Sequence, residues 1–211
     1  MNAMRPTALI FDFGQVLIDL DMERAKASFA ALGIPDLDEL FTLLKADPLV
    51  VGLEKGEVGP AAFYETVRSL AVGNPTDGQI EGAWNDILGD YRLESLRFVE
   101  RLRRTMPVYL FSNTNAIHYD SFQDKLRTST PYQRLEDLFT RSYFSHTMGM
   151  RKPAPEGYLQ IIKDNGLLAA GTLFVDDLQD NVLGARAVGM QAHRLLPGER
   201  IEVLFSHLLE G

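Results

Sequence analysis

Residues 10–17 read IFDFGQVL, and this stretch places a single carboxylate at the end of an apolar run. The run Ala8–Phe11 is short and uncharged, Asp12 follows it directly, and Gly14 stands two residues further on. A short apolar run of this kind is typical of a buried strand in a parallel sheet. Taken alone, Asp12 and Gly14 fit a simple turn after that strand. Other segments of the chain decide whether Asp12 has a chemical role.

The composition narrows the class of protein. The chain has 211 residues, 45% of them hydrophobic, which suits one large domain or a domain that carries a smaller inserted one. The net charge of −8 argues against nucleic acid or an anionic membrane as the main partner. No cysteine is present, so disulfide and thiolate chemistry are excluded. No apolar stretch approaches about 18 residues and the first residues do not resemble a signal peptide, so we expect a cytoplasmic protein.

Further apolar runs predict the fold class. Four more short runs follow the first, at 108–111, 142–145, 173–175 and, more weakly, 192–196. Helical patterns lie between the later runs, over 154–165 and 179–188, and each stops at a glycine, Gly166 or Gly189. Strands that alternate with helices are typical of an α/β, doubly wound, Rossmann-like parallel sheet.

A long segment between the first two runs differs from the rest. It carries helical patterns over 22–33, 36–47, 59–73, 76–88 and 93–105, separated by glycine and proline breaks, and no clear strand pattern. We therefore expect an all-helical insertion in the sheet domain, with the last pattern packed on the sheet. The predicted boundaries are 19–91 for the insertion, and 1–18 with 92–211 for the sheet domain.

Polar residues follow the carboxyl ends of three of these runs. They are Asp12, the pair Ser112 and Asn113, and the pair Asp176 and Asp177. Ligands of an open parallel sheet bind at this edge, so these side chains are expected to meet in one cleft. Each also has a simpler interpretation: Ser112 or the two aspartates could cap the helices that follow them.

A lysine completes the set. Lys152 stands just before a helix that begins with proline, in GMRKPAPEGY, although it could also be a solvated surface residue. A carboxylate can attack phosphorus, hard oxygens can hold Mg²⁺, and a lysine can neutralise a phosphate. These are the residue types that phosphoryl transfer through an aspartate requires.

The motifs and their order resemble the haloacid dehalogenase-like (HAD) hydrolase superfamily. FDFGQVL is similar to its first motif, LFSNTN to its second, GMRKP to its third and LFVDDLQDN to its fourth, and the helical insertion resembles the family's cap domain. The resemblance spans nearly the whole chain. It is greatest to the subgroup that contains bacterial glucose-1-phosphate phosphatase and the phosphatase domain of soluble epoxide hydrolase.

The resemblance implies roles for the motif residues. Asp12 matches the nucleophile, Ser112 with the adjacent Asn113 matches the phosphoryl-binding position, and Lys152 matches the lysine that steadies nucleophile and phosphate. Asp177 matches the metal-binding acid and Asp176 a supporting acid. The implied cofactor is Mg²⁺, held by Asp12, the backbone carbonyl of Gly14, Asp177 and Asp176.

Position 14 departs from the family pattern. Most phosphatases of the family carry an aspartate here, which protonates the leaving oxygen and later activates water, whereas this chain has glycine. A substitute acid could come from the cap, from Asp19, Asp21 or His118, or from water. His118 could also face the substrate, and the turn VGLEKGEVG at 51–59 could point at the cleft or be a solvated loop.

Three functions follow from these observations. The favoured prediction is a Mg²⁺-dependent phosphatase that acts on a small phosphorylated metabolite, with a sugar phosphate as the first choice. The second is a 2-haloacid dehalogenase. Dehalogenases of the resembled family displace halide with the same aspartate and without a metal. The acids in VDDLQDN favour the phosphatase, because a metal-free site has little use for clustered carboxylates. The third is a domain that binds a phosphometabolite or a protein without turnover. A monomer and a homodimer are both compatible with the sequence.

Overall fold

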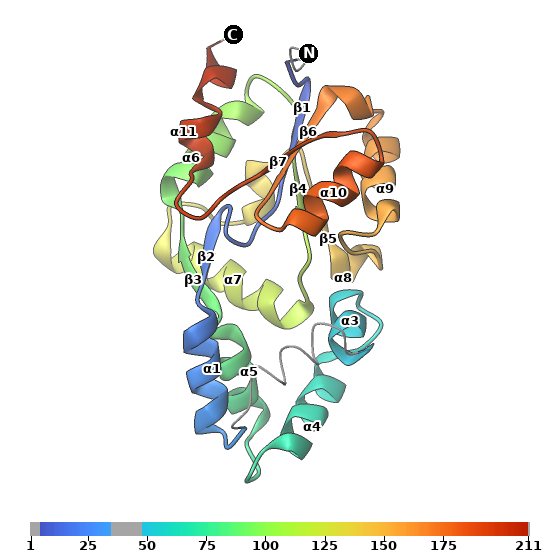
Figure 1. The fold of residues 1–211 in the computed structure, drawn as a ribbon. Coiled ribbons are helices and arrows are strands. Elements are labelled where there is room, and N and C mark those ends of the chain that lie inside the picture. Colours follow the sequence, from blue (N-terminus) through green and yellow to red (C-terminus); the bar gives the residue numbers. More distant parts are fainter. Residues whose placement is uncertain (1–4, 35–47, 211) are drawn as a thin grey trace.

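A five-stranded parallel sheet forms the centre of the protein (Figure 1). The computed structural model describes residues 5–34 and 48–210. The strand order is β5-β4-β1-β6-β7, which confirms the predicted doubly wound α/β sheet. The strands are β1 (Ala8–Phe11), β4 (Val108–Ser112), β5 (Arg141–Phe144), β6 (Thr172–Asp176) and β7 (Gln191–Arg194).

Helices cover both faces of this sheet. Alternate residues of β1 point to opposite faces, so that Leu9 and Phe11 belong to one buried cluster while Ala8 and Ile10 belong to another. The first cluster is closed by α6 (Leu93–Arg103), α7 (Ala116–Ser129) and α11 (Ile201–Leu204). The second is closed by α9 (Pro155–Asn165) and α10 (Gln179–Ala187). Short helices connect these layers: α8 (Ser145–Met148) and 3₁₀ turns at Leu135–Leu138, Ala169–Gly171 and Ser206–Leu209.

The strand register brings the polar strand ends together. Phe11 pairs with Leu110 on one side and with Val175 on the other, so Asp12, Ser112 and Asp176 lie at the same edge of three adjacent strands. The strand order reverses at β1: the chain adds β4 and β5 on one side of β1 and then β6 and β7 on the other. This is the position at which open α/β sheets bind ligands.

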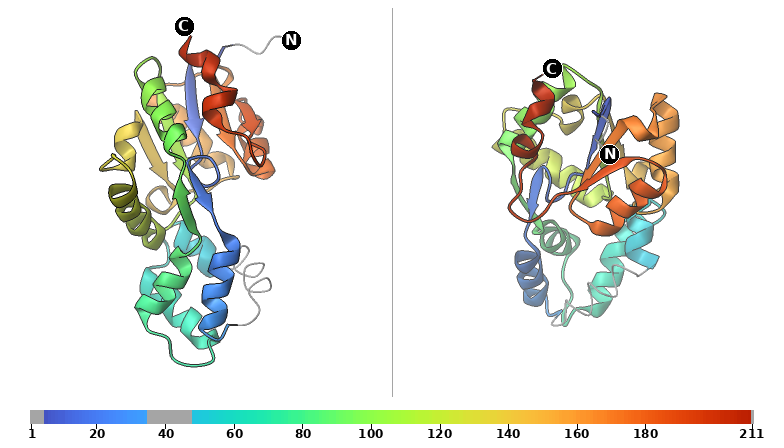
Figure 2. Two further views of the ribbon diagram at one scale, coloured as in Figure 1. Left: turned by 90° about the vertical axis from the view of Figure 1, so that its left-hand side faces the viewer. Right: turned by 45° about the horizontal axis from the view of Figure 1, so that its top comes forward.

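The inserted segment forms a second helical body at the other end of the molecule from both chain termini (Figure 2). Buried aromatic side chains of Phe29, Phe63 and Trp84 make up much of its core. The prediction of a helix over 36–47 lies outside the described residues. The helices of the described part are α1 (Met22–Ala31), α3 (Pro48–Glu54), α4 (Pro60–Leu70) and α5 (Asp77–Asn85).

The expectation that this segment contains no strand is wrong. The strand β2 (Ile18–Leu20) pairs antiparallel with β3 (Leu88–Tyr91) and connects the two bodies. The two paired strands form a ribbon. Helix α5 ends at Asn85, so the predicted helix over 76–88 is too long at its C-terminal end, where the chain enters β3. Gly89 is required there, since a Cβ at this position would lie 2.6 Å from the backbone oxygen of Asp19. Strands this short are specified by their pairing partner rather than by their own residues, which is why the pattern missed them.

An arginine at the start of α6 ties this ribbon to the loop after Asp12. Arg92 Nε donates to Asp19 Oδ1 at 2.7 Å, and Nη2 donates to Gln15 Oε1 at 3.0 Å. Gln15 adopts a left-handed backbone conformation with φ 54°, which turns the chain sharply after β1. The loop that carries Gly14 is therefore anchored to the base of the insertion.

No helix within residues 5–34 and 48–210 combines the length and the apolar character that crossing a bilayer requires.

Close packing at α10 gives a test of the fold. A Cβ at Gly184 would lie 2.4 Å from the backbone oxygen of Pro153, which follows Lys152. Because that neighbour is backbone, we expect Gly184→Ala to lower the free energy of unfolding by about 1–3 kcal/mol, measured by urea denaturation. The control is Gly82→Ala in α5, where no atom lies within 4 Å of the new Cβ. It should raise stability by about 0.5–1 kcal/mol. Equal effects at the two sites would contradict the packing of α10 on Pro153.

Candidate active site

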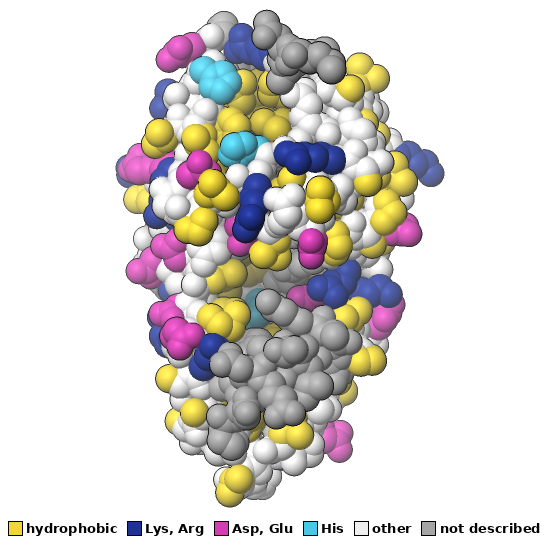
Figure 3. All heavy atoms as spheres, viewed as in Figure 1, with side chains coloured by type: hydrophobic (Ala, Val, Ile, Leu, Met, Phe, Trp, Pro, Cys, Tyr) yellow, Lys and Arg dark blue, Asp and Glu magenta, His cyan; other side chains and the backbone are white. Residues whose placement is uncertain are grey.

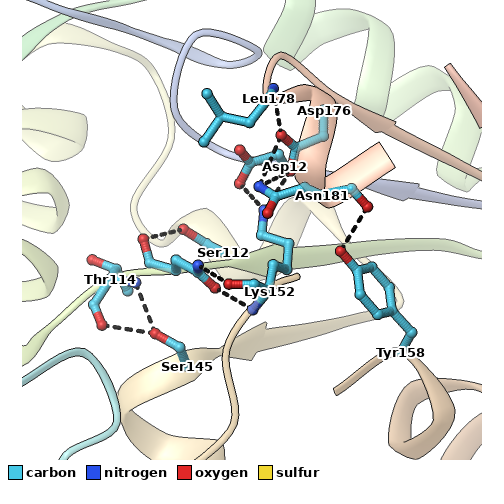
Figure 4. A network of polar contacts seen from close by, with 10 residues as sticks. Asp12, Ser112, Thr114, Ser145, Lys152, Tyr158, Asp176, Leu178 and Asn181 are labelled. Carbon is cyan, nitrogen blue, oxygen red and sulfur yellow. Dashed lines mark hydrogen bonds and ion pairs between the residues drawn. The ribbon is translucent and has the colours of Figure 1, made fainter. Parts of the chain in front are cut away.

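A buried lysine stands at the centre of a network of polar contacts (Figure 4). The side chain of Lys152 is 1% exposed, and its ammonium lies 2.6 Å from Asp12 Oδ1 and 2.7 Å from Asp176 Oδ2. The interpretation of Lys152 as a solvated surface residue is therefore wrong. Because Asp12 follows β1 and Asp176 ends β6, one cation joins the ends of two adjacent strands.

Asp176 is held by contacts on both oxygens. Its Oδ1 accepts the backbone N–H of Leu178 at 2.8 Å, and the Asn181 side-chain amide lies 3.0 Å from each carboxylate oxygen. The Asn181 backbone oxygen in turn accepts the Tyr158 hydroxyl at 2.8 Å. Asp176 is 0% exposed, so its charge serves to fix Lys152 and α10. The N-cap of α10 is Leu178, so neither aspartate is the N-cap residue.

Asn113 positions the backbone of the same lysine. Its amide nitrogen donates to the Lys152 carbonyl oxygen at 2.9 Å, and its amide oxygen accepts the Lys152 N–H at 2.9 Å. The planar side-chain amide of Asn113 thus bonds both backbone polar groups of one residue, Lys152. These two hydrogen bonds hold the loop before α9 against the C-terminal end of β4.

Ser112 ends β4 beside these groups. It is 2% exposed, and its hydroxyl has a single long contact, 3.5 Å from the Asn113 carbonyl oxygen. The alternative that Ser112 caps the next helix is wrong, because Asn115 is the N-cap of α7 and accepts the N–H of His118. The Ser145 hydroxyl accepts from Thr114 N and donates to Thr114 O, both at 2.9 Å, which fixes the loop after Ser112.

Three carboxylates crowd this edge of the sheet. Asp12, Asp176 and Asp177 each offer one oxygen, and these oxygens lie within 4.8 Å of one another. Burial, and next the charge of Asp176, raise the pKa of Asp12 to about 8, and the same two causes raise the pKa of Asp177. Burial acts to lower the pKa of Lys152, but the charges of Asp12 and Asp176 outweigh it and the pKa is raised. One ammonium does not balance three carboxylates, so the site favours a further cation, and its hard oxygens suit Mg²⁺.

A cavity of about 200 Å³ opens next to this cluster, between the sheet domain and the insertion. Gly14, Ser112 and Asn113, which follow the ends of β1 and β4 or end β4, are among the residues that line it. Apolar side chains form much of the remaining wall, namely Phe13, Leu20, Met22, Val50, Trp84, Ile87, Leu88 and Phe122. Figure 3 shows the hollow on this face of the molecule, with hydrophobic and charged side chains along its border. The cavity can hold the organic part of a small ligand whose phosphate reaches Ser112.

His118 lies on the wall of this cavity. Its ring stacks on Trp84 with centroids 4.9 Å apart, and its Nδ1 lies 2.9 Å from Asn85 Oδ1. Burial lowers the pKa of His118 to about 3, so the ring is neutral at neutral pH and is a poor proton donor. Contact between His118 and a substrate stays a prediction.

The two other candidate acids, Asp19 and Asp21, make contacts away from the cavity. Asp19 pairs with Arg92 at 2.7 Å, and Asp21 accepts the N–H of Arg24 as the N-cap of α1. Neither residue lines the cavity. Among the described residues, the carboxyl group on the cavity wall belongs instead to Glu54, at the end of α3.

Sequence reasoning missed several residues that support the site. Tyr158 and Ser145 carried no signal, because their partners are backbone groups of distant segments. Arg151 and Glu54 both lie within motifs that the sequence singled out, GMRKP and VGLEKGEVG, but their ion pair could not be inferred from either segment alone.

Comparison with known proteins decides the family. A D-ribitol-5-phosphate phosphatase of Bacteroides thetaiotaomicron is 30% identical over 183 residues, which cover 87% of this chain and 88% of the relative. A HAD family enzyme from the same organism, crystallised with magnesium and inorganic phosphate, superposes with a TM-score of 0.84 at 34% identity. The alignment covers 95% of this chain and 99% of that one. The chain belongs to the haloacid dehalogenase-like (HAD) hydrolase superfamily.

The relatives of this HAD protein differ in their substrates. The sesquiterpene phosphatase astK of Aspergillus oryzae is 32% identical over 141 residues, covering 65% of this chain and 67% of the relative. No protein-family model matches the chain. The resemblance to the glucose-1-phosphate phosphatase subgroup stays a prediction.

The carboxylate cluster predicts a measurable effect of Mg²⁺ on stability. At a concentration about 100 times its Kd, a ligand that binds only the folded state adds about 2.7 kcal/mol. We expect Mg²⁺ to raise the Tm of the wild type and to have a much smaller effect on Asp177→Asn. The control is Asp180→Asn, an exposed acid three residues further along. An unchanged Mg²⁺ response in Asp177→Asn would exclude Asp177 as a ligand.

The raised pKa of Asp12 predicts a pH dependence in the metal-free protein. Its folded-state pKa of about 8 lies above the ordinary value of 3.8, so the folded state binds the proton more tightly than the unfolded chain. This group's contribution to stability is therefore lost as pH rises from about 4 to about 8. In EDTA, the Tm of the wild type should fall relative to that of Asp12→Asn across this window. Parallel Tm curves for the two proteins would contradict the raised pKa.

Proposed function

We propose that this HAD protein is a Mg²⁺-dependent phosphatase that hydrolyses a small phosphorylated metabolite through an aspartyl-phosphate intermediate. The observation that carries the proposal is the contact between Asp12 and the buried ammonium of Lys152, beside two further carboxylates and next to a cavity lined by Gly14 and Ser112. This arrangement offers a nucleophile, a cation site and room for an organic leaving group.

Each residue of the cluster has a task in this reaction. Asp12 attacks phosphorus, so a bond forms from its carboxylate oxygen as the bond from phosphorus to the leaving oxygen breaks. Lys152 keeps Asp12 in place and balances negative charge on the phosphoryl oxygens. The Ser112 hydroxyl is free to donate to one of these oxygens. Water then attacks phosphorus and frees Asp12.

Mg²⁺ would be held by Asp12, Asp177 and the backbone carbonyl of Gly14, with Asp176 as a buried support. When bound, it neutralises charge on the phosphate and on the attacking carboxylate. The magnesium and phosphate complex of the structural relative supports Mg²⁺ as the ion.

A sugar phosphate or sugar-alcohol phosphate is the proposed substrate class. The D-ribitol-5-phosphate phosphatase, a relative that aligns with most of this chain, supports it. The helical segment 19–91 is proposed as the cap that selects the leaving group, because its residues Trp84 and Glu54 line the cavity. We propose that the partner is this small metabolite rather than nucleic acid or a membrane. We also propose that the protein is cytoplasmic and is a monomer or a homodimer.

The carboxylate cluster also weighs against the dehalogenase alternative. Displacement of halide from carbon by Asp12 alone would leave Asp176 and Asp177 close by, with only Lys152 to balance them. Burial of uncompensated charge is costly, so a chain selected for that reaction gains nothing from these acids.

Phosphate release tests the proposed function. We expect release from a panel of sugar phosphates, sugar-alcohol phosphates and small phosphomonoesters with Mg²⁺, and none with EDTA. Asp12→Asn should lower the rate by roughly 10³-fold or more, since it removes the nucleophile. The panel is run beside 2-haloacids with a halide assay. Halide release without phosphate release would establish the dehalogenase instead, and neither product from folded protein would support a binding domain.

A further inference from the structure

Glycine at position 14 leaves the proposed phosphatase without the side chain that would protonate the leaving oxygen. An alkoxide is a poor leaving group, so a phosphatase that acts on sugar-type phosphates needs a proton donor near that oxygen. The structure removes three candidates: Asp19 and Asp21 lie outside the cavity, and His118 is neutral. The donor has to be sought among the other residues of the cavity wall.

Glu54 is the one carboxyl group among the described residues that line the cavity. It shares this wall with Gly14 and Ser112, although it comes from α3 of the cap and they come from the sheet domain. One cavity is therefore lined both by Glu54 and by Ser112, where a phosphate would bind. A leaving group bound in this cavity would lie between them.

The surroundings of Glu54 suit a group that exchanges a proton. Its side chain is 21% exposed, and its Oε2 lies 2.9 Å from Arg151 Nη2. That oxygen accepts no aligned hydrogen bond from the described residues. Burial raises the pKa of Glu54, while the charges of Arg151 and then Lys152 act to lower it. A carboxyl group whose pKa is raised holds its proton to higher pH than an ordinary glutamate, which favours general acid catalysis.

The turn that follows Glu54 is fixed against the sheet domain. Helix α3 packs on α8, and Gly56 has φ 69° with its Cα close to the backbone of His146. A Cβ at Gly56 would lie 2.2 Å from the His146 carbonyl oxygen, so only glycine allows this approach. The contact holds the end of α3 over the cleft, which gives Glu54 a defined place.

We propose that Glu54 of the cap is the proton donor and acceptor of the reaction, in place of the acid absent at position 14. The inference rests on the proposed phosphatase function. It also gives the segment 51–59 a direct part in the chemistry rather than in substrate selection alone.

The proton is accounted for in both steps. In the first, the Glu54 carboxyl group gives its proton to the leaving oxygen as that oxygen separates from phosphorus and Asp12 bonds to phosphorus. The alcohol departs and Glu54 is left as a carboxylate. In the second, that carboxylate takes a proton from the attacking water. The Asp12–phosphorus bond breaks, phosphate departs and Glu54 is protonated again.

Titratable groups lie on the elements packed around Glu54. They come from its own turn, from α7, from α8 and from the loop before α9, and they are Lys55, Glu57, His118, His146, Arg151 and Lys152. Of these, the charges of Arg151 and then Lys152 act on the pKa of Glu54. Burial lowers the pKa of His146 as well as that of His118, so the two histidines add little positive charge at neutral pH. Arg151 is therefore the cation in contact with the Glu54 carboxyl group.

Leaving-group dependence separates a proton donor from a residue that only joins cap and core. The probes are D-ribitol 5-phosphate and glycerol 3-phosphate, whose alkoxides need a proton, and p-nitrophenyl phosphate, whose leaving group does not. We expect Glu54→Gln to lower kcat/KM for the alkyl phosphates by about 10²–10⁴-fold, and for p-nitrophenyl phosphate by less than about tenfold. The matched control is Glu57→Gln in the same turn, which changes an exposed acid paired with Lys55 and should leave both rates unchanged.

Arg151→Gln provides the second variant. It breaks the same contact between cap and core but keeps the carboxyl group, so the ratio of alkyl to aryl rates should fall far less than in Glu54→Gln. If Glu54→Gln and Arg151→Gln instead lower all rates equally, the pair is structural and the inference is overturned. A wild type that hydrolyses only p-nitrophenyl phosphate would also overturn it. Absence of phosphate release from all three probes in the wild type would overturn the proposed function itself.

Discussion

The ion pairs of Lys152 are the constraint on which the rest of the site depends. A buried ammonium is tolerated only with partners, and Asp12 and Asp176 supply them at 2.6 and 2.7 Å. Removing one member of such a group costs roughly 3–5 kcal/mol, because the remaining charges stay buried. The supports are equally specific: Asn113 fixes the lysine backbone, and Asn181 fixes Asp176. The excess of carboxylates that remains is what makes the site attractive to a metal ion.

The fold accounts for how distant segments reach this lysine. Parallel strands β4, β1 and β6 end at one edge, and their register leaves Ser112, Asp12 and Asp176 side by side. The helical insertion is joined to this edge by the ribbon β2–β3, and Arg92 ties the ribbon to the loop after Asp12. Residues of the sheet edge and residues of the insertion thereby line one cavity, as the proposed chemistry and the proposed selection of the leaving group require.

The sequence predicts the motif residues well because their signals are local. A short apolar run followed by a polar residue marks Asp12, Ser112 and Asp176, and the rule for parallel sheets then brings them together. Contacts between segments are not local, and these were missed. The ribbon β2–β3 exists through its pairing, and the neutral state of His118 follows from burial that no pattern reveals. From the sequence, the segment 51–59 that contains Glu54 could either point at the cleft or be a solvated loop. Only the position of Glu54 on the cavity wall favours the first interpretation.

The central claim is that Asp12 carries the phosphoryl group during turnover. Its most direct test is rapid acid quenching of wild-type protein during hydrolysis of a sugar phosphate with Mg²⁺, followed by mass spectrometry of the peptides. The account predicts one phosphoryl group on the peptide that contains Asp12, at a level that falls when substrate is exhausted. A phosphoryl group on Ser112, or phosphate release with no phosphorylated peptide at any time, would contradict it.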